Sequence, residues 1–222
     1  MFVCTFILFV IYLYWVMKMI FVIDLDDTVC ETNEYSEYYI KKFIKENNLP
    51  YSFVQSKCRF AESKFDWDKD TALTWYKTYG DQMMLEFSCK KYAVGIINKL
   101  FDAGHTIIIA TARATDWHTN PEEVTLQWLD KVGLKYNKIY MGRVDKEKIC
   151  EEEHADVFVD DDLKITGRVA EYFAKSSKVV YLMTTDYNRD LPHADGIVRV
   201  NDFVEIYNDM AKRQNSITGC IM

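Results

Sequence analysis

Short apolar segments alternate with helical patterns along the second half of this chain, and this alternation constrains the fold more than any other feature. The strand-like segments, rich in β-branched and aromatic residues, are 105–110, 138–141, 156–159, 178–182 and 197–200. Helical patterns lie near Lys146 and over 164–175 and 202–214. Strands that alternate with helices form a parallel sheet with helices on both faces. The sequence therefore predicts an α/β fold with a doubly wound, Rossmann-like sheet.

Two helices in this region have recognisable ends. Gly104 is expected to end a helix over 90–101, because glycine readily adopts the left-handed conformation found after many helices. Asn120 and Pro121 are typical of an N-cap and a first turn, and Gly133 is expected to close the helix that they begin.

An acidic motif follows one further strand-like segment, 19–23. Asp24 and Asp26 come directly after it, and Asp27 and Thr28 complete the motif. Open α/β sheets bind ligands at the carboxyl ends of their strands. Two like charges on one face of an extended segment are costly unless a cation lies between them. The motif therefore indicates a phosphoryl-transfer site, and a surface acidic turn is the alternative.

Three more motifs follow in a fixed order. They are a strand-like segment that leads to Thr111, the pair Asp145-Lys146 at the start of a helix, and a strand-like segment that leads to Asp160-Asp161. Together with Asp24-x-Asp26-x-Thr28 they resemble the four motifs of the haloacid dehalogenase (HAD) superfamily of phosphatases. The resemblance extends from Met19 to about Arg213.

The resemblance implies catalytic and phosphate-binding roles. Asp24 is expected to be the nucleophile that forms a phosphoaspartate. Asp26 is expected to protonate the leaving alcohol and then to deprotonate the attacking water, while Thr28 braces the loop. Thr111 and Lys146 are expected to bind the phosphate oxygens.

The resemblance also implies a magnesium site. Mg²⁺ prefers hard oxygen ligands in octahedral geometry. The ion is expected to be bound by Asp24, by the backbone carbonyl of Asp26 and by the acid pair Asp160-Asp161, in which Asp160 is the main ligand.

Several neighbouring residues have more than one interpretation. Lys148 competes with Lys146 on spacing, and Asp162 can be a solvated third acid. Arg113 can reach a second substrate group or form a structural salt bridge. His118, His154 and His193 show no metal-ligand spacing and are expected at the surface.

An insertion of helical character, residues 30–88, lies between the first two motifs, and in the HAD superfamily such an insertion forms a cap over the site. It contains thirteen of the 33 aromatic residues of the chain. These side chains either form the core of the cap, or one of them, such as Tyr35, Trp67 or Trp75, stacks on a planar base. The predicted catalytic core is 19–29 with 89–214.

Less specific features resemble the deoxyribonucleotidase branch and its bacterial nucleotidase-like relatives. They are the helical insertion, the Thr-Ala-Arg end of the second motif, Thr125-x-x-Trp128-Leu129, Asp145-Lys146, and Tyr187-Asn188-Arg189. The resemblance implies a 5'-nucleotidase-like hydrolase of small nucleoside monophosphates. The alternatives are a HAD phosphatase of sugar phosphates or polynucleotide ends, and a non-catalytic HAD-like binding protein.

The net charge and the cysteines limit the kinds of binding partner and cellular setting that this chain can have. A net charge of -7 argues against a general polynucleotide binder, which needs a basic face. Six cysteines are scattered without a C-x-x-C pair, which favours a reduced, cytoplasmic setting. The partner expected is a small phosphorylated, nucleotide-like substrate.

The two ends of the chain need separate interpretations. Residues 2–17 are almost wholly apolar. We interpret 1–18 as a start-site artefact, a membrane anchor or an additional packed element. A spanning helix would bring Asp24 to the membrane interface, because no linker precedes the strand at Met19. Residues 215–222 are predicted to form a tail.

Overall fold

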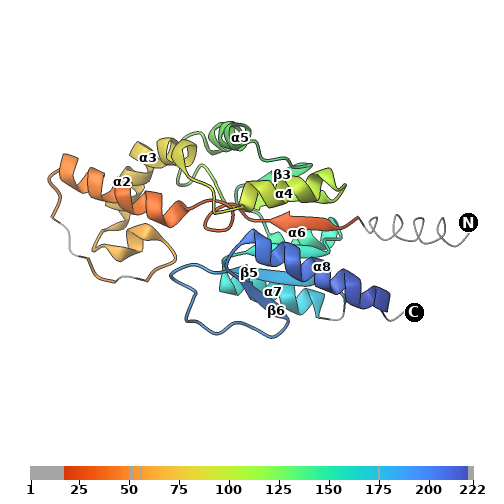
Figure 1. Ribbon diagram of the computed structural model, residues 1–222. Coiled ribbons are helices and arrows are strands. Elements are labelled where there is room, and N and C mark those ends of the chain that lie inside the picture. The colour runs from red at the N-terminus through yellow and green to blue at the C-terminus, as the bar shows by residue number, and fades with distance from the viewer. Residues whose placement is uncertain (1–17, 51–52, 56, 175, 220–222) are drawn as a thin grey trace, which may run out of the picture.

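The computed structural model describes residues 18–50, 53–55, 57–174 and 176–219, and it contains one parallel sheet of six strands (Figure 1). The order across the sheet is β3-β2-β1-β4-β5-β6. The strands are β1 (Ile20–Ile23), β2 (Thr106–Thr111), β3 (Lys138–Met141), β4 (Val157–Asp160), β5 (Val179–Met183) and β6 (Ile197–Val200). The predicted doubly wound α/β fold is confirmed.

The strand order puts a topological switch point at β1. The chain runs from β1 outward through β2 to β3, and then returns to add β4 on the other side of β1. Parallel strands all end at the same edge, and ligands of such sheets bind where the strand order reverses. Asp24, directly after β1, and Asp160, the last residue of β4, both lie at this point.

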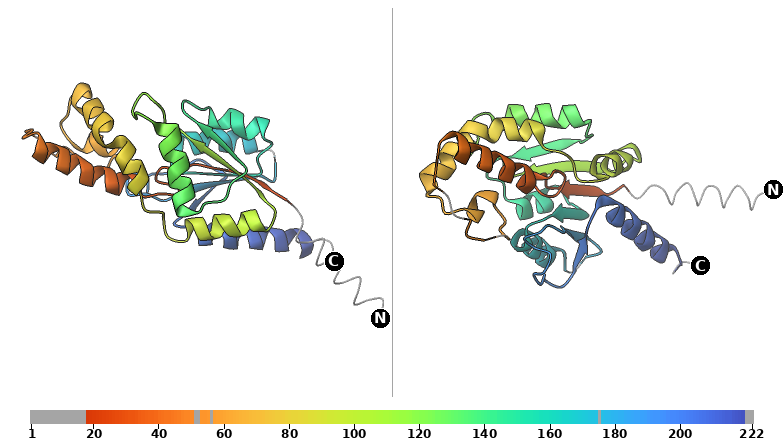
Figure 2. Two further views of the ribbon diagram at one scale, coloured as in Figure 1. Left: turned by 90° about the horizontal axis from the view of Figure 1, so that it is seen from above. Right: turned by 60° about the vertical axis from the view of Figure 1, so that its left-hand side comes forward.

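Helices cover both faces of the sheet (Figure 2). The helices α4 (Ala93–Asp102), α5 (Pro121–Val132) and α8 (Phe203–Gly219) cover one face, and α6 (Lys146–Glu152) and α7 (Leu163–Phe173) cover the other. Along each strand, side chains alternate between the faces: Phe21 and Ile23 pack with the first group, whereas Val22 packs with the second. Both sides of the strand are therefore buried, which explains why its sequence is continuously apolar.

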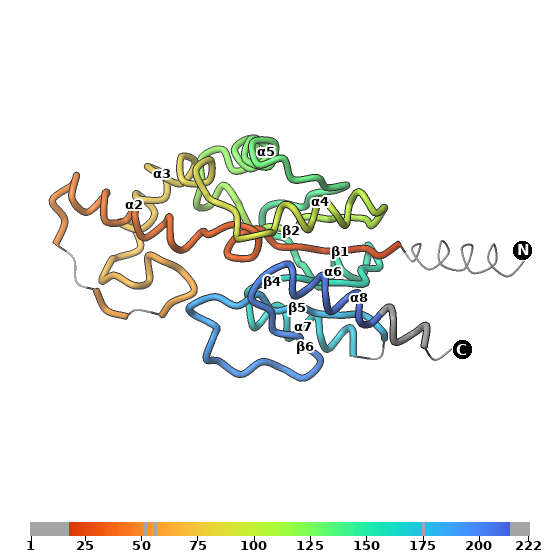
Figure 3. Tube along the Cα trace, viewed as in Figure 1, coloured from red at the N-terminus to blue at the C-terminus, as the bar shows by residue number. Residues whose placement is uncertain are grey.

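The insertion forms a separate helical layer beyond the carboxyl ends of the strands (Figures 1 and 3). It consists of α2 (Thr32–Glu46), the short 3-10 helix η1 (Ala61–Lys64) and α3 (Lys69–Glu86). Phe43 and Tyr79 are buried between the helices, and Trp75 is fully buried on α3. Most aromatic side chains of the insertion thus supply its core. Its predicted role as a cap remains a prediction.

Trp128 joins this layer to the core. It lies on α5, is 0% exposed, and its indole Nε1 donates a hydrogen bond of 2.8 Å to the carbonyl of Phe87 at the end of α3. Nearby, Asp81 of α3 accepts hydrogen bonds from the amides of Thr119 and Asn120. The insertion is therefore anchored along α5.

The ends of some elements differ from the predictions. Asn120 occupies the N-cap position of α5, but its side chain makes no capping hydrogen bond and instead donates to Asp81. Gly104 and Gly133 adopt positive φ after α4 and α5, as predicted. Helix α8 continues to Gly219, into the predicted tail.

The prediction about residues 2–17 lies outside the described residues. Within the described part of the chain, none of the helices combines the length and the apolar character needed to span a bilayer.

We expect Trp128→Ala to lower the free energy of unfolding by about 3–5 kcal/mol, because it removes a fully buried indole and its hydrogen bond. Leu126→Ala is the matched control, since Leu126 lies on the same helix but is exposed. That variant should change stability by less than about 1 kcal/mol. Urea denaturation measures both, and equal losses would contradict the anchoring role of Trp128.

Candidate active site at the carboxyl edge of the sheet

A tight loop after β1 presents the first motif. The carbonyl of Leu25 accepts hydrogen bonds from the amides of Thr28, Val29 and Cys30 at 2.8–3.2 Å. Asp27 has a φ of 56°, in the left-handed region that aspartate tolerates better than most residues. The backbone thus reverses within a few residues and keeps Asp24 at the edge of the sheet.

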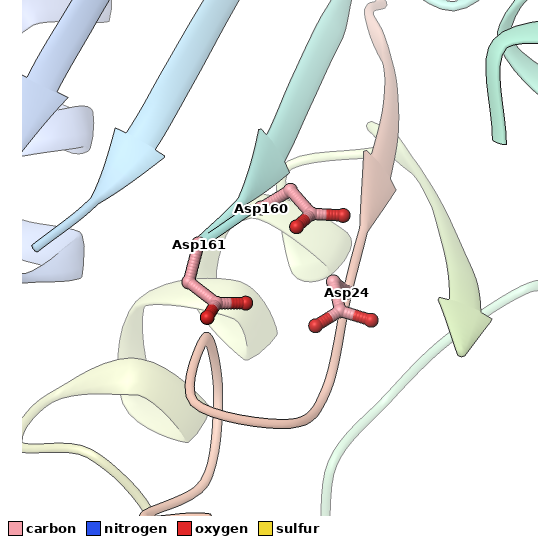
Figure 4. Close-up of side chains that lie close together, drawn as sticks. All are labelled: Asp24, Asp160 and Asp161. Carbon is pink, nitrogen blue, oxygen red and sulfur yellow. The ribbon is translucent and has the colours of Figure 1, made fainter. Parts of the chain in front are cut away.

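Three carboxylates converge at this edge. Figure 4 shows Asp24 after β1 and Asp160 and Asp161 at the end of β4, with their carboxyl groups close together. One oxygen of each lies within 4.8 Å of the others, and all three side chains are buried. The structure thus brings together the three side chains predicted to bind the metal, whereas the fourth ligand, the backbone carbonyl of Asp26, stays a prediction.

Lys146 lies between two of these acids. Its Nζ is 2.6 Å from Asp24 Oδ1 and 2.7 Å from Asp160 Oδ2, and the residue is 5% exposed. Asp145 caps α6 through the amides of Glu147 and Lys148, which fixes Lys146 as the first residue of the helix.

The competing Lys148 points elsewhere. Its side chain is exposed and pairs with Glu152 at 3.5 Å. The geometry therefore favours Lys146 as the lysine of this site.

Asp161 is fixed by partners from two other segments. Thr28 Oγ1 donates to Asp161 Oδ1 at 3.4 Å, and the Tyr187 hydroxyl donates to Oδ2 at 2.9 Å. Asn188 Nδ2 donates to the Asp161 carbonyl at 2.9 Å. Thr28 thus braces an acid rather than facing open space. The sequence carried no sign that Tyr187 and Asn188 hold Asp161.

The electrostatics of the cluster call for a further cation. Burial, only partly offset by Lys146, raises the pKa of Asp24 to about 7, with Asp160 adding to the rise. Burial and the neighbouring Asp160 also raise the pKa of Asp161 well above its usual range. When all three carboxylates are ionised, the single ammonium of Lys146 leaves an excess of two negative charges. Converging carboxylate oxygens with that excess fit Mg²⁺.

Asp26 has a different environment. Arg113 Nη2 lies 2.8 Å from Asp26 Oδ1, and its Nε lies 3.1 Å from Oδ2. Burial alone would raise the pKa of Asp26, but the guanidinium outweighs it and lowers that pKa to about 2. Thr111 Oγ1 is 3.4 Å from Asp26 Oδ2 and is fully buried. Of the two interpretations of Arg113, the salt bridge is the one observed.

A cavity of about 340 Å³ opens between the acids and the insertion. On the sheet side it is lined by Asp24, Asp26, Asp160, Asp161, Arg113 and Lys146. On the other side Arg59, Phe60, Glu62, Tyr76, Phe87, Trp117 and His118 line it, among others. The candidate site is therefore a polar floor under a largely aromatic and apolar wall.

Two predictions about single residues are wrong. His118 does not lie at the surface: it lines the cavity, its Nδ1 is buried without a partner among the described residues, and burial lowers its pKa to about 4. Asp162 is not solvated. It caps α7 and forms an ion pair with Arg59 of the insertion. No pattern in the sequence indicates that Arg59 pairs with Asp162, because the two residues are far apart along the chain.

The aromatic side chains at the cavity differ from those we named. Tyr35, Trp67 and Trp75 are not among the described residues that line it. Trp67 and Trp75 contact each other instead, with their ring centroids 6.1 Å apart. Tyr76 and Trp117 do line the cavity, and their ring centroids lie 5.5 Å apart.

We expect Lys146→Met to lower the free energy of unfolding of the metal-free protein by about 3–5 kcal/mol, because it leaves two buried carboxylates unpaired. Lys148→Met is the matched control, and its exposed i,i+4 pair should account for no more than about 0.5 kcal/mol. Urea denaturation in the presence of a chelator compares them. Equal stabilities of the two variants would argue against the buried ion pairs.

Known structures resemble most of the chain, although no protein-family model and no curated protein matches its sequence. CbbY from Rhodobacter sphaeroides, in complex with phosphate, matches with a TM-score of 0.59 and 14% identity over 86% of this chain and 96% of its own. A predicted phosphoglycolate phosphatase from Haemophilus somnus matches with a TM-score of 0.57 and 15% identity over 87% of this chain and 98% of its own. YfnB from Bacillus subtilis, a HAD-hydrolase bound to magnesium, matches with a TM-score of 0.57 and 12% identity over 87% of this chain and 99% of its own. The chain thus has the fold of the HAD-like hydrolases.

Proposed function

We propose that this protein is a Mg²⁺-dependent phosphomonoester hydrolase that acts through a phosphoaspartate, with small nucleoside monophosphates as its substrates. One observation carries the proposal: Asp24, at the switch point of a HAD-like sheet, faces Asp160, Asp161 and Lys146 at the floor of a cavity. Phosphate binding and magnesium binding by proteins of this fold agree with it.

The residues at this edge supply what phosphoryl transfer needs. Asp24 attacks the phosphorus, and the alcohol leaves. Mg²⁺, held by Asp24, Asp160 and Asp161, would neutralise the charge between the anionic nucleophile and the anionic phosphate. Lys146 binds phosphate oxygens and stabilises the charge that develops on them. Thr111, expected to do the same, is fully buried and is not among the described residues that line the cavity; its hydroxyl lies 3.4 Å from Asp26 Oδ2.

Asp26 exchanges protons with the leaving alcohol and with water. With Arg113 beside it and a pKa of about 2, its carboxylate is ionised at neutral pH and is ready to accept a proton from the attacking water. Donation of a proton to the leaving group requires the salt bridge with Arg113 to open. The pairing therefore favours the hydrolysis of the phosphoaspartate over its formation.

The wall of the cavity supports a substrate with a flat leaving group. Tyr76 and Trp117 offer aromatic surface, and Phe87 adds a buried ring. Stacking of a base on an aromatic side chain contributes about 1–3 kcal/mol in single-stranded nucleic-acid complexes. A sugar phosphate is the second candidate, since the polar residue Ser36 also lines the cavity.

Asp24→Asn should lower turnover of p-nitrophenyl phosphate by at least about a thousandfold, because the amide cannot attack phosphorus. Folding should survive, since the change relieves repulsion among buried acids. Asp130→Asn, at an exposed position on α5, is the control and should keep wild-type activity. Retention of a tenth of the activity in Asp24→Asn would refute the assigned nucleophile.

Mg²⁺ should raise the melting temperature of the wild-type protein, because it binds only the folded state. At a hundred times its dissociation constant a ligand stabilises by about 2.7 kcal/mol. Asp160→Asn should lose most of this increment, whereas Asp130→Asn should retain it. Chelation should abolish hydrolysis, and added Mg²⁺ should restore it. An unchanged increment in Asp160→Asn would place the metal elsewhere.

A further inference from the structure

The far wall of the cavity holds a carboxylate that phosphoryl transfer does not use. Glu62 of η1 and Tyr76 of α3 both line the cavity. The Tyr76 hydroxyl donates a hydrogen bond of 3.0 Å to Glu62 Oε2. This bond fixes the side chain and favours its ionised form, which opposes the rise in the pKa of Glu62 that burial causes. Glu62 therefore adds a negative charge to the part of the cavity that would receive the alcohol portion of a phosphate ester.

The cations at the cavity are all committed to other carboxylates. Among the described residues that line it they are Lys146, Arg113 and Arg59. The first is paired with Asp24 and Asp160, the second with Asp26, and the third with Asp162.

Of these three cations only Arg59 belongs to the insertion that also contains Glu62, and its partner is fixed. Asp162 is 4% exposed and accepts hydrogen bonds from two amides at the start of α7. His118 adds no charge near neutral pH, because burial lowers its pKa to about 4. The wall therefore offers no unpaired positive charge from the described residues.

We propose that Glu62 makes this site selective for phosphate monoesters whose alcohol portion is uncharged, such as a nucleoside or a neutral sugar. Esters with a second anionic group, such as phosphoglycolate or a bisphosphate, are disfavoured. A second anion would meet Glu62 with no free cation to balance it, and like charges repel strongly where water is partly excluded. The inference rests on the proposed hydrolase activity and narrows its substrate class.

Two esters that differ mainly in one charge test this selectivity. 2-Hydroxyethyl phosphate has a neutral alcohol portion, and phosphoglycolate has a carboxylate in the same place. With Mg²⁺ we expect the wild-type protein to prefer the neutral ester by at least about tenfold in kcat/KM. In Glu62→Gln this preference should fall to within about threefold, chiefly through a lower KM for phosphoglycolate.

Glu46→Gln is the matched control. Glu46 also accepts a hydrogen bond from a tyrosine of the insertion, Tyr79, but it does not line the cavity. Its preference should equal that of the wild type. Glutamine keeps the size of glutamate and can still accept a hydrogen bond, so both variants should fold.

Hydrolysis of p-nitrophenyl phosphate reports the basal activity of all three proteins. A wild type that hydrolyses this ester but accepts phosphoglycolate as readily as 2-hydroxyethyl phosphate overturns the role of Glu62 and leaves the hydrolase intact. An unchanged preference in Glu62→Gln overturns it as well. A wild type that hydrolyses none of the three esters overturns the proposed function, and the selectivity with it.

Discussion

The buried cluster of Asp24, Asp160 and Asp161 around Lys146 is the interaction on which the rest of the site depends. Burying several like charges is costly unless fixed partners surround them. The parallel sheet brings the acids together, because β1 and β4 are neighbours and end at the same edge. Lys146 then balances only part of the charge. The same excess of buried negative charge that is unfavourable by itself would favour a divalent cation at this site, as the proposed function requires.

A second ion pair, Asp26 with Arg113, connects the chemistry to the inserted helices. The guanidinium lies over the rings of Phe87 and Trp128, 5.5 and 5.6 Å from their centroids. Trp128 in turn is hydrogen-bonded to the carbonyl of Phe87. The Asp26 carboxylate, the proposed general acid and base, is therefore positioned by the junction at which the insertion meets the core. A shift of the insertion along α5 would move Arg113 and change the pKa of Asp26.

Local sequence was sufficient for the sheet but not for the contacts between distant segments. The predicted strands 138–141 and 197–200 match β3 and β6, because each is a short apolar run. Asp162 looked solvated because it is the third acid in a row, and Arg59 reaches it only after folding. Trp75 and Tyr76 are adjacent on α3 and point about 100° apart. In a helix with so many aromatic residues, periodicity does not say which of them faces the cavity.

Chemistry and recognition come from parts of the molecule that are held in different ways. The acids sit at strand ends whose positions are fixed by the register of the sheet. Arg59 and Glu62 belong to the segment before and within η1, which ion pairs tie to the core: Arg59 with Asp162, and Lys57 with Asp190. Substitutions in this segment would alter the charge that lines the cavity and leave the proposed metal and phosphate ligands in place. Selectivity in this protein can therefore change without any change in the residues that carry out the reaction.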